Sequence, residues 1–153
     1  MSILVVYDSI YGNTEKIAQA IGAAIGADVL RAGDVKPDQL TGLDVLLVGS
    51  PTQAFQPLQP MKTFLKEIPF GALKGVKVAS FDTRMDVAAV NNRFLTIMAN
   101  LFGYAAKPIA ATLMKKGGLS IASPEGFIVS DKEGPLKEGE LERAVQWAKQ
   151  IVV

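Results

Sequence analysis

The chain of 153 residues contains no cysteine and no histidine. Without cysteine it cannot form a disulfide or use a thiolate as a nucleophile. Without either residue it cannot build the cysteine and histidine clusters that bind zinc, or the serine–histidine triad of many hydrolases. We therefore expect no metal site and no catalytic residue of these kinds.

Strong net charge and long apolar runs are also missing. There are 16 Lys and Arg residues and 15 Asp and Glu residues, and the basic residues form no long run, so nothing points to nucleic acid as a partner. No apolar stretch approaches the roughly 20 residues that span a bilayer, so we expect no membrane span and a cytoplasmic protein. With 49% hydrophobic residues, the chain is expected to form one domain over residues 1–153.

What the chain does have is an alternation of short apolar runs with segments of helical periodicity. This alternation predicts an α/β fold, with a mostly parallel sheet and helices on both of its faces. The expected strands lie near 3–7, 28–31, 45–48 and 76–81. The first expected helix follows the first strand and ends near residue 25. The other expected helices lie near 61–68, 88–102, 108–113 and 141–148.

Three further expectations concern the last strand and two of the helices. Segments 119–122 and 127–129 both have strand character, and Pro124 between them would break a central ladder, so we expect a hairpin or an interrupted strand at that edge. Trp147 has charged and polar neighbours and is expected to be partly buried. The expected buried face of the 88–102 helix consists of Phe94, Leu95, Met98, Leu101 and Phe102.

The most informative segment is the polar loop after the first expected strand. It carries hydroxyl groups at Ser9, Tyr11 and Thr14, an amide at Asn13, and one glycine, Gly12. Apolar residues at helical spacing follow, so this loop leads into the N-terminus of a helix. The free N–H groups of a helix N-terminus bind anions, most simply a phosphate. The loop therefore predicts a phosphate site that uses neutral hydrogen bonds alone.

Two other phosphate loops do not match this segment. A Walker loop needs a lysine directly after its last glycine, and the dinucleotide fingerprint needs three glycines at fixed spacing, whereas here Gly12 stands alone before Asn13. The remaining alternative is an ordinary helix start, with Asn13 or Thr14 as the cap and Glu15 in the first turn. One polar residue would be enough for a cap, and the loop offers four, which favours phosphate binding.

The segment 9–14 resembles the phosphate loop of the flavodoxin family, in which hydroxyl residues are followed by glycine, a variable residue and threonine. Segments 49–55 and 81–84 stand where flavodoxins have their two flavin-ring loops, so the resemblance covers essentially the whole chain. It implies a doubly wound, five-stranded sheet in the order 2-1-3-4-5, and FMN as cofactor. The residues that it assigns to FMN binding are Ser9, Ile10, Tyr11, Gly12, Asn13 and Thr14; Pro51, Thr52, Gln53, Ala54 and Phe55; and Phe81, Asp82, Thr83 and Arg84.

In open α/β sheets the ligand lies beyond the carboxyl ends of the strands, so these three segments are expected to be neighbours. Phe55 either stacks on the flavin ring or lies beneath a proline-rich loop. Phe81 has the pattern of a core residue as well. Arg84 either places a cation near the ring and raises its reduction potential, or makes a surface ion pair with Asp82 or Asp86.

Two features depart from many flavodoxins. The third segment has no tyrosine to stack on the ring, and the chain lacks the strong acidity that suits basic redox partners. We nevertheless predict an FMN-binding electron-transfer protein that passes electrons from a reductase to an acceptor protein. The first alternative is an FMN-dependent oxidoreductase acting on a quinone-like or porphyrinogen-like molecule, with loop 56–60 and the helix near Pro108 as pocket walls. The second alternative is a flavin-free domain that binds a phosphorylated ligand or another protein.

Overall fold

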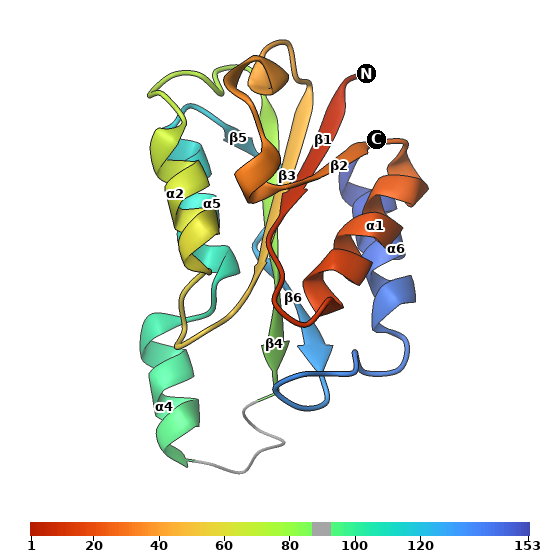
Figure 1. Ribbon diagram of the computed structural model, residues 1–153, viewed down its shortest axis with the longest axis vertical. Helices are drawn as coiled ribbons and strands as arrows, with labels where there is room; N and C mark the ends of the chain where they lie inside the picture. The colour runs from red at the N-terminus through yellow and green to blue at the C-terminus, as the bar shows by residue number, and fades with distance from the viewer. Residues whose placement is uncertain (87–92) are drawn as a thin grey trace.

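The computed structural model describes residues 1–86 and 93–153, without the side chains of residues 101 and 102. Its centre is a parallel sheet (Figure 1). In spatial order, its first four strands are β2 (Asp28–Arg31), β1 (Ile3–Tyr7), β3 (Val45–Pro51) and β4 (Lys77–Met85). The predicted order and the parallel arrangement are confirmed.

The far edge of β4 pairs with two short strands, β5 (Leu119–Ser120) and β6 (Glu125–Val129). β5 lies beside the start of β4, and β6 lies beside its end, and both run parallel to it. The two strands of a hairpin would run antiparallel to each other. Because β5 and β6 run in the same direction, this edge of the sheet is the interrupted strand that the sequence analysis gave as the alternative to a hairpin. Pro124 lies in the interruption, where it removes no ladder hydrogen bond.

Helices cover both faces of the sheet (Figure 1). One face packs against α1 (Asn13–Ile25) and α6 (Glu140–Ile151). The other face packs against α2 (Gln59–Glu67) and α5 (Ala106–Lys115). Two short 3-10 helices, η1 (Ala32–Asp34) and η2 (Pro37–Leu40), follow β2. In the described part of the chain, none of the helices has the length and apolar character needed to cross a membrane.

The apolar runs of the strands are explained by burial on both faces. In β1, Val5 packs in the layer under α1 and α6, whereas Val6 packs in the layer under α2 and α5. Successive side chains of a strand point to opposite faces, so each run supplies both layers. Gly49 in β3 is required by close packing, because a Cβ at this position would lie 2.1 Å from the ring of Phe81.

The prediction for Trp147 was wrong. Trp147 is 9% exposed, and its ring packs edge-on against Phe81 and Phe127 in the core. The polar neighbours that suggested partial exposure occupy other faces of α6, because residues adjacent in a helix point in different directions.

The prediction for the helix after β4 was partly wrong. This helix, α4 (Arg93–Phe102), lies beyond α2 and α5, towards the carboxyl end of β4 (Figure 1). Phe94 is 66% exposed rather than buried, because α4 does not cover the sheet. Leu95 and Met98 are half-buried. The side chains of Leu101 and Phe102, and the expected helical residues 88–92, lie outside what the structure describes.

β4 continues four residues beyond the end expected from its apolar run. Asp82, Thr83 and Arg84 are therefore strand residues rather than loop residues, paired with β6. Pairing with β3 also extends to Pro51 opposite Thr83. These residues are polar, so the search for apolar runs did not assign them to the strand. Their strand conformation depends on pairing with β3 and β6, which are distant in the sequence.

Candidate functional site

The loop between β1 and α1 has the geometry of an anion site. Gly12 stands at the N-cap of α1 with a φ of 90°, a left-handed conformation that favours glycine. Its N–H donates to the Ser9 hydroxyl at 3.1 Å, which closes the loop. The first backbone hydrogen bond of α1 runs from the Lys16 N–H to the Gly12 carbonyl. The N–H groups of residues 13–15 are therefore not used within the helix.

The simple capping alternative is not formed. The Thr14 hydroxyl lies 2.7 Å from the Thr83 hydroxyl of β4. The Asn13 amide donates to the Glu133 carbonyl at 3.1 Å. Among the described residues, no side chain makes a capping hydrogen bond at Gly12. The polar side chains of the loop thus connect it to distant segments and leave the helix N–H groups available.

A crevice of about 90 Å³ opens beside this loop. Its lining residues are Ser9, Ile10, Tyr11, Asn13, Thr14, Pro51, Thr52, Thr83, Arg84, Met85, Val129 and Lys132. The segments that the sequence analysis singled out do meet here, and the Thr52 N–H donates to the Thr83 carbonyl at 2.9 Å. Lys132, from the turn after β6, adds a cation that the loop itself lacks. We refer to this space as the polar crevice.

A second crevice, of about 210 Å³, adjoins the first. It is lined by Thr52, Ala54, Phe55, Arg84, Met85, Leu95 and Tyr104. Three of these residues, Thr52, Arg84 and Met85, also line the polar crevice. The rings of Phe55 and Tyr104 lie 6.4 Å apart at an angle of 57°. We call this space the aromatic crevice.

A strained turn presents Phe55 to the aromatic crevice. Gln53 and Gln56 exchange two backbone hydrogen bonds of 2.9 Å, which closes a tight turn. Its central residues, Ala54 and Phe55, have φ values of 49° and 64°. Positive φ values at two successive non-glycine residues are costly, and such strain concentrates at functional sites.

Arg84 lies between the two crevices and is paired with a buried carboxylate. Its guanidinium donates to both oxygens of Asp82, at 2.7 and 2.8 Å, and lies 3.8 Å from the centre of the Tyr104 ring. The Asp82 side chain is 0% exposed and that of Arg84 is 22% exposed. The expected pairing with Asp82 is thus present, although it is largely buried rather than on the surface.

The Asp82 carboxyl faces into the protein. It also accepts the Ala106 N–H at 2.9 Å. Burial raises the pKa of Asp82, and the hydrogen bonds from Arg84 oppose that rise. Because Asp82 lines neither crevice, it acts on this site by holding Arg84.

Other predicted residues are placed in different ways. Ile10 and Tyr11 are half-exposed at the polar crevice, 52% and 46%. Phe81 is fully buried against Phe127 and Trp147, so its side chain reaches neither crevice. The side chain of Gln53 is exposed and lines neither crevice.

Five lining residues lie outside the predicted site residues: Met85, Leu95, Tyr104, Val129 and Lys132. Lys132 belongs to a polar turn that follows the segment 127–129. If that segment had been assigned as a parallel neighbour of β4, the turn would have been expected at the carboxyl edge of the sheet, beside the crevices. Tyr104 had no comparable signal, because its position depends on where α4 and α5 are placed. It places an aromatic ring at the aromatic crevice.

Comparison with known proteins agrees with this fold. A family model described as flavodoxin matches residues 5–83, slightly more than half of the chain. No curated protein sequence matches the chain significantly. Among solved structures, the chain is similar to a flavodoxin from the domain Archaea, at 24% identity and a TM-score of 0.74 over 99% of this chain and 96% of that chain.

Two further structures show the same fold. Oxidised flavodoxin 1 from Bacillus cereus is 16% identical, with a TM-score of 0.75 over 99% of this chain and 97% of that chain. Rubredoxin oxygen:oxidoreductase from Desulfovibrio gigas is 18% identical, with a TM-score of 0.72 over 98% of this chain but only 35% of that chain. Together with the two adjoining crevices at the carboxyl ends of the strands, the family match leads to one conclusion: the chain belongs to the flavodoxin family.

Proposed function

We propose that this chain is an FMN-binding electron-transfer protein, with the FMN phosphate in the polar crevice and the flavin ring in the aromatic crevice. The observation that carries the proposal is the adjacency of these two spaces. A helix N-terminus with unused N–H groups opens into one space, and two aromatic rings border the other. A molecule with a phosphate at one end and a flat ring at the other matches that arrangement.

The chain's own groups would divide the binding between them. The N–H groups of residues 13–15, with Ser9 and Thr14, would donate hydrogen bonds to the phosphate. Lys132 would neutralise part of its charge. When bound, FMN supplies the redox chemistry, because the protein itself has no redox-active side chain of the cysteine type.

On the ring side the protein would mainly orient the flavin and exclude water. Phe55 and Tyr104 supply flat apolar surface for this purpose. Pro51, Thr52 and Ala54 would border the ring from β3 and the strained turn. Arg84 would place its guanidinium close to the ring, with its charge partly balanced by Asp82.

The enzyme alternative needs a substrate pocket that communicates with the ring. A cavity of about 290 Å³ does lie between Pro57 and Pro108, as that alternative expects. None of the residues that line it lines either crevice. A substrate bound there would not contact the residues around the ring, so the arrangement favours the electron carrier.

The test is electron transfer by the FMN-loaded protein. Cytochrome c should be reduced by NADPH only when both a flavodoxin reductase and the FMN-loaded chain are present. The isolated chain should turn over NADPH and menadione slowly and without saturation. Rapid, saturable menadione reduction by the isolated chain would instead establish the oxidoreductase, and failure to transfer electrons in both assays would refute both functions.

A further inference from the structure

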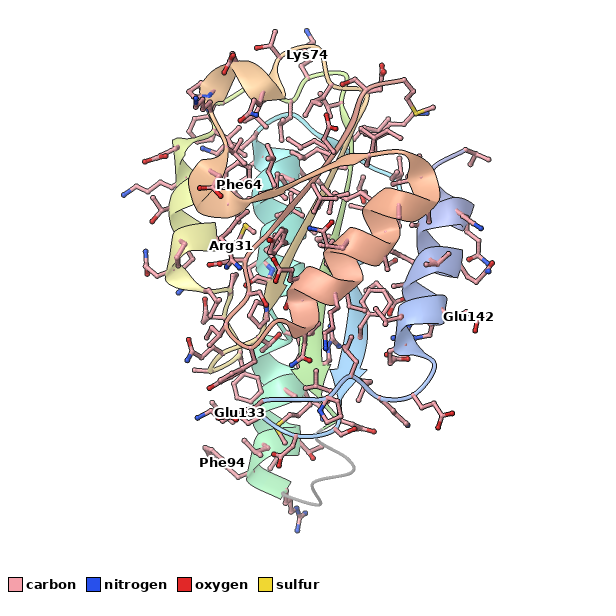
Figure 2. The ribbon with its side chains drawn as sticks, turned by 45° about the vertical axis from the view of Figure 1, so that its right-hand side comes forward. Arg31, Phe64, Lys74, Phe94, Glu133 and Glu142 are labelled. Atoms are coloured by element: carbon pink, nitrogen blue, oxygen red, sulfur yellow. The ribbon has the colours of Figure 1, made fainter. Side chains whose placement is uncertain are left out.

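A larger cavity lies at the opposite end of the sheet from the two crevices. Its volume is about 470 Å³, and its lining includes Leu43 and Val76, which stand at the amino ends of β3 and β4. Figure 2 shows Lys74, another lining residue, at the opposite end of the molecule from Glu133, which contacts the phosphate loop. The proposed electron transfer makes no use of this space, which we call the amino-end cavity.

The walls of the amino-end cavity are mostly apolar. Phe64, Ile68 and Val76 form part of the core layer under α2, and each is less than one-tenth exposed. Val35 and Leu40, from the η1–η2 segment, line it as well and are half-buried. Small-molecule pockets have volumes of about 300–1,000 Å³ and walls of this kind, with a few polar groups at defined positions. The volume and the composition of the walls therefore fit a small, largely apolar ligand.

The charged residues of the cavity indicate the sign of that ligand. Lys36 and Lys74 line it, and Glu67 is its acidic residue. Within the described ranges, 1–86 and 93–153, none of these three side chains forms an ion pair with another residue. Two ammonium groups against one carboxylate favour a ligand with a single negative charge over a neutral or cationic ligand of the same shape.

We propose that the amino-end cavity binds an amphipathic monocarboxylate, that is, an apolar chain with one carboxylate. The apolar chain would lie against Val35 and Leu40, above the buried layer of Phe64, Ile68 and Val76. The carboxylate would lie at the rim with Lys36 and Lys74. This site does not depend on the proposed FMN site, because the two share no residue.

The test is calorimetric titration of the full chain, saturated with FMN where FMN binds and as purified otherwise. The probes are hexanoate, octanoate and decanoate below their micellar concentrations. Affinity should rise about tenfold for every two added methylene groups, since each buried methylene contributes a nearly constant transfer free energy. At equal chain length, octanoate should bind about fivefold more tightly than 1-octanol, and octyltrimethylammonium should bind least.

Two sets of variants locate the binding. Ala72 is exposed and lines the cavity, so Ala72→Trp should fill it and weaken octanoate and 1-octanol at least tenfold. The Lys36→Gln/Lys74→Gln double variant should weaken octanoate about fivefold and leave 1-octanol unchanged. Ala23→Trp, at an exposed position of α1 away from the cavity, is the matched control and should bind octanoate as the parent does.

Three results would overturn the proposal. One is no octanoate binding by the parent chain at millimolar concentration. The second is octanoate binding that neither Ala72→Trp nor the double lysine variant changes. The third is a preference for the cationic probe. If Ala72→Trp fails to fold, the double lysine variant decides between the outcomes. FMN titration of the same samples reports the other site separately.

Discussion

Thr14 is the side chain with which the phosphate assignment can be tested most directly. It is 1% exposed, and its hydroxyl lies beside both the helix N-terminus and the Thr83 hydroxyl. Thr14→Ala should weaken FMN binding about 10–100-fold, because a hydrogen bond to a charged group is lost. Riboflavin, which has no phosphate, should bind almost as before. Fluorescence titration with both flavins measures the difference.

Two controls accompany this variant. Thr14→Ser keeps the hydroxyl and should retain most of the FMN affinity. Thr63→Ala, at an exposed position of α2, should change neither affinity. An equal loss of FMN and riboflavin in Thr14→Ala would show that the phosphate lies elsewhere.

The Asp82–Arg84 pair is the second residue-scale test. A cation near the ring stabilises the negative charge of the reduced flavin, and the carboxylate partner reduces that effect. Asp82→Asn should therefore raise the reduction potential of bound FMN, and Arg84→Ala should lower it. A change of 1–2 kcal/mol corresponds to about 40–90 mV for a one-electron step. Potentiometric titration with redox dyes measures both values.

Arg84→Lys separates charge from geometry, because an ammonium keeps the charge but cannot bind both carboxylate oxygens in the same planar arrangement. Its potential should lie between those of the parent and Arg84→Ala. If all three variants bind FMN at the parent's potential, the pair has only a structural role.

At the scale of elements, Glu140 connects α6 to β6 close to the turn that carries Lys132. Its carboxylate accepts the Ile128 N–H at 2.7 Å and hydrogen bonds from Arg143 at 2.8 and 2.9 Å. The bonds from Arg143, with a contribution from the Ile128 N–H, lower the pKa of Glu140. The same arginine also donates to the Gly126 carbonyl of β6. The start of α6 is thus held against the edge of the sheet.

Glu140→Gln should reduce the free energy of unfolding at pH 7 by about 1–3 kcal/mol. Since the folded pKa is below the unfolded value of about 4.3, the parent's advantage is complete above that pH and declines as the pH falls through the folded pKa. Urea unfolding at pH 7 and in the acidic range below pH 4 measures this difference. Glu142→Gln removes the same charge from an exposed position two residues further along α6, and it should have little effect.

At the scale of the whole molecule, the two crevices exist only in the folded chain. Their walls come from β1–α1, β3, β4, β6 and the α4–α5 connection, so unfolding separates the binding groups. FMN at 100 times its dissociation constant should therefore add about 2.7 kcal/mol to stability. For a chain of this size, the unfolding midpoint should rise by about 5–10 °C. Scanning calorimetry measures the shift, and an unchanged midpoint at saturating FMN would contradict a site built from these segments.

The strand order was implied by the family resemblance. Local pattern was sufficient for the α/β class, the mostly parallel sheet and the phosphate-loop candidate. Each of these depends on short-range information: apolar runs of strand length, helical periodicity, and a polar loop directly before Asn13. The absence of cysteine and histidine likewise limits the chemistry of the chain wherever its residues lie.

Features that join distant segments could not be read in this way. The extension of β4 through Arg84 depends on β6, about 40 residues later, and the burial of Trp147 depends on Phe81 and Phe127. Tyr104 and Lys132 reach the site from elements whose placement the sequence pattern does not reveal. Strand pairing and side-chain packing depend on which segments come together in the folded chain. The sequence pattern shows only whether each segment is apolar or polar, not which segment it will contact.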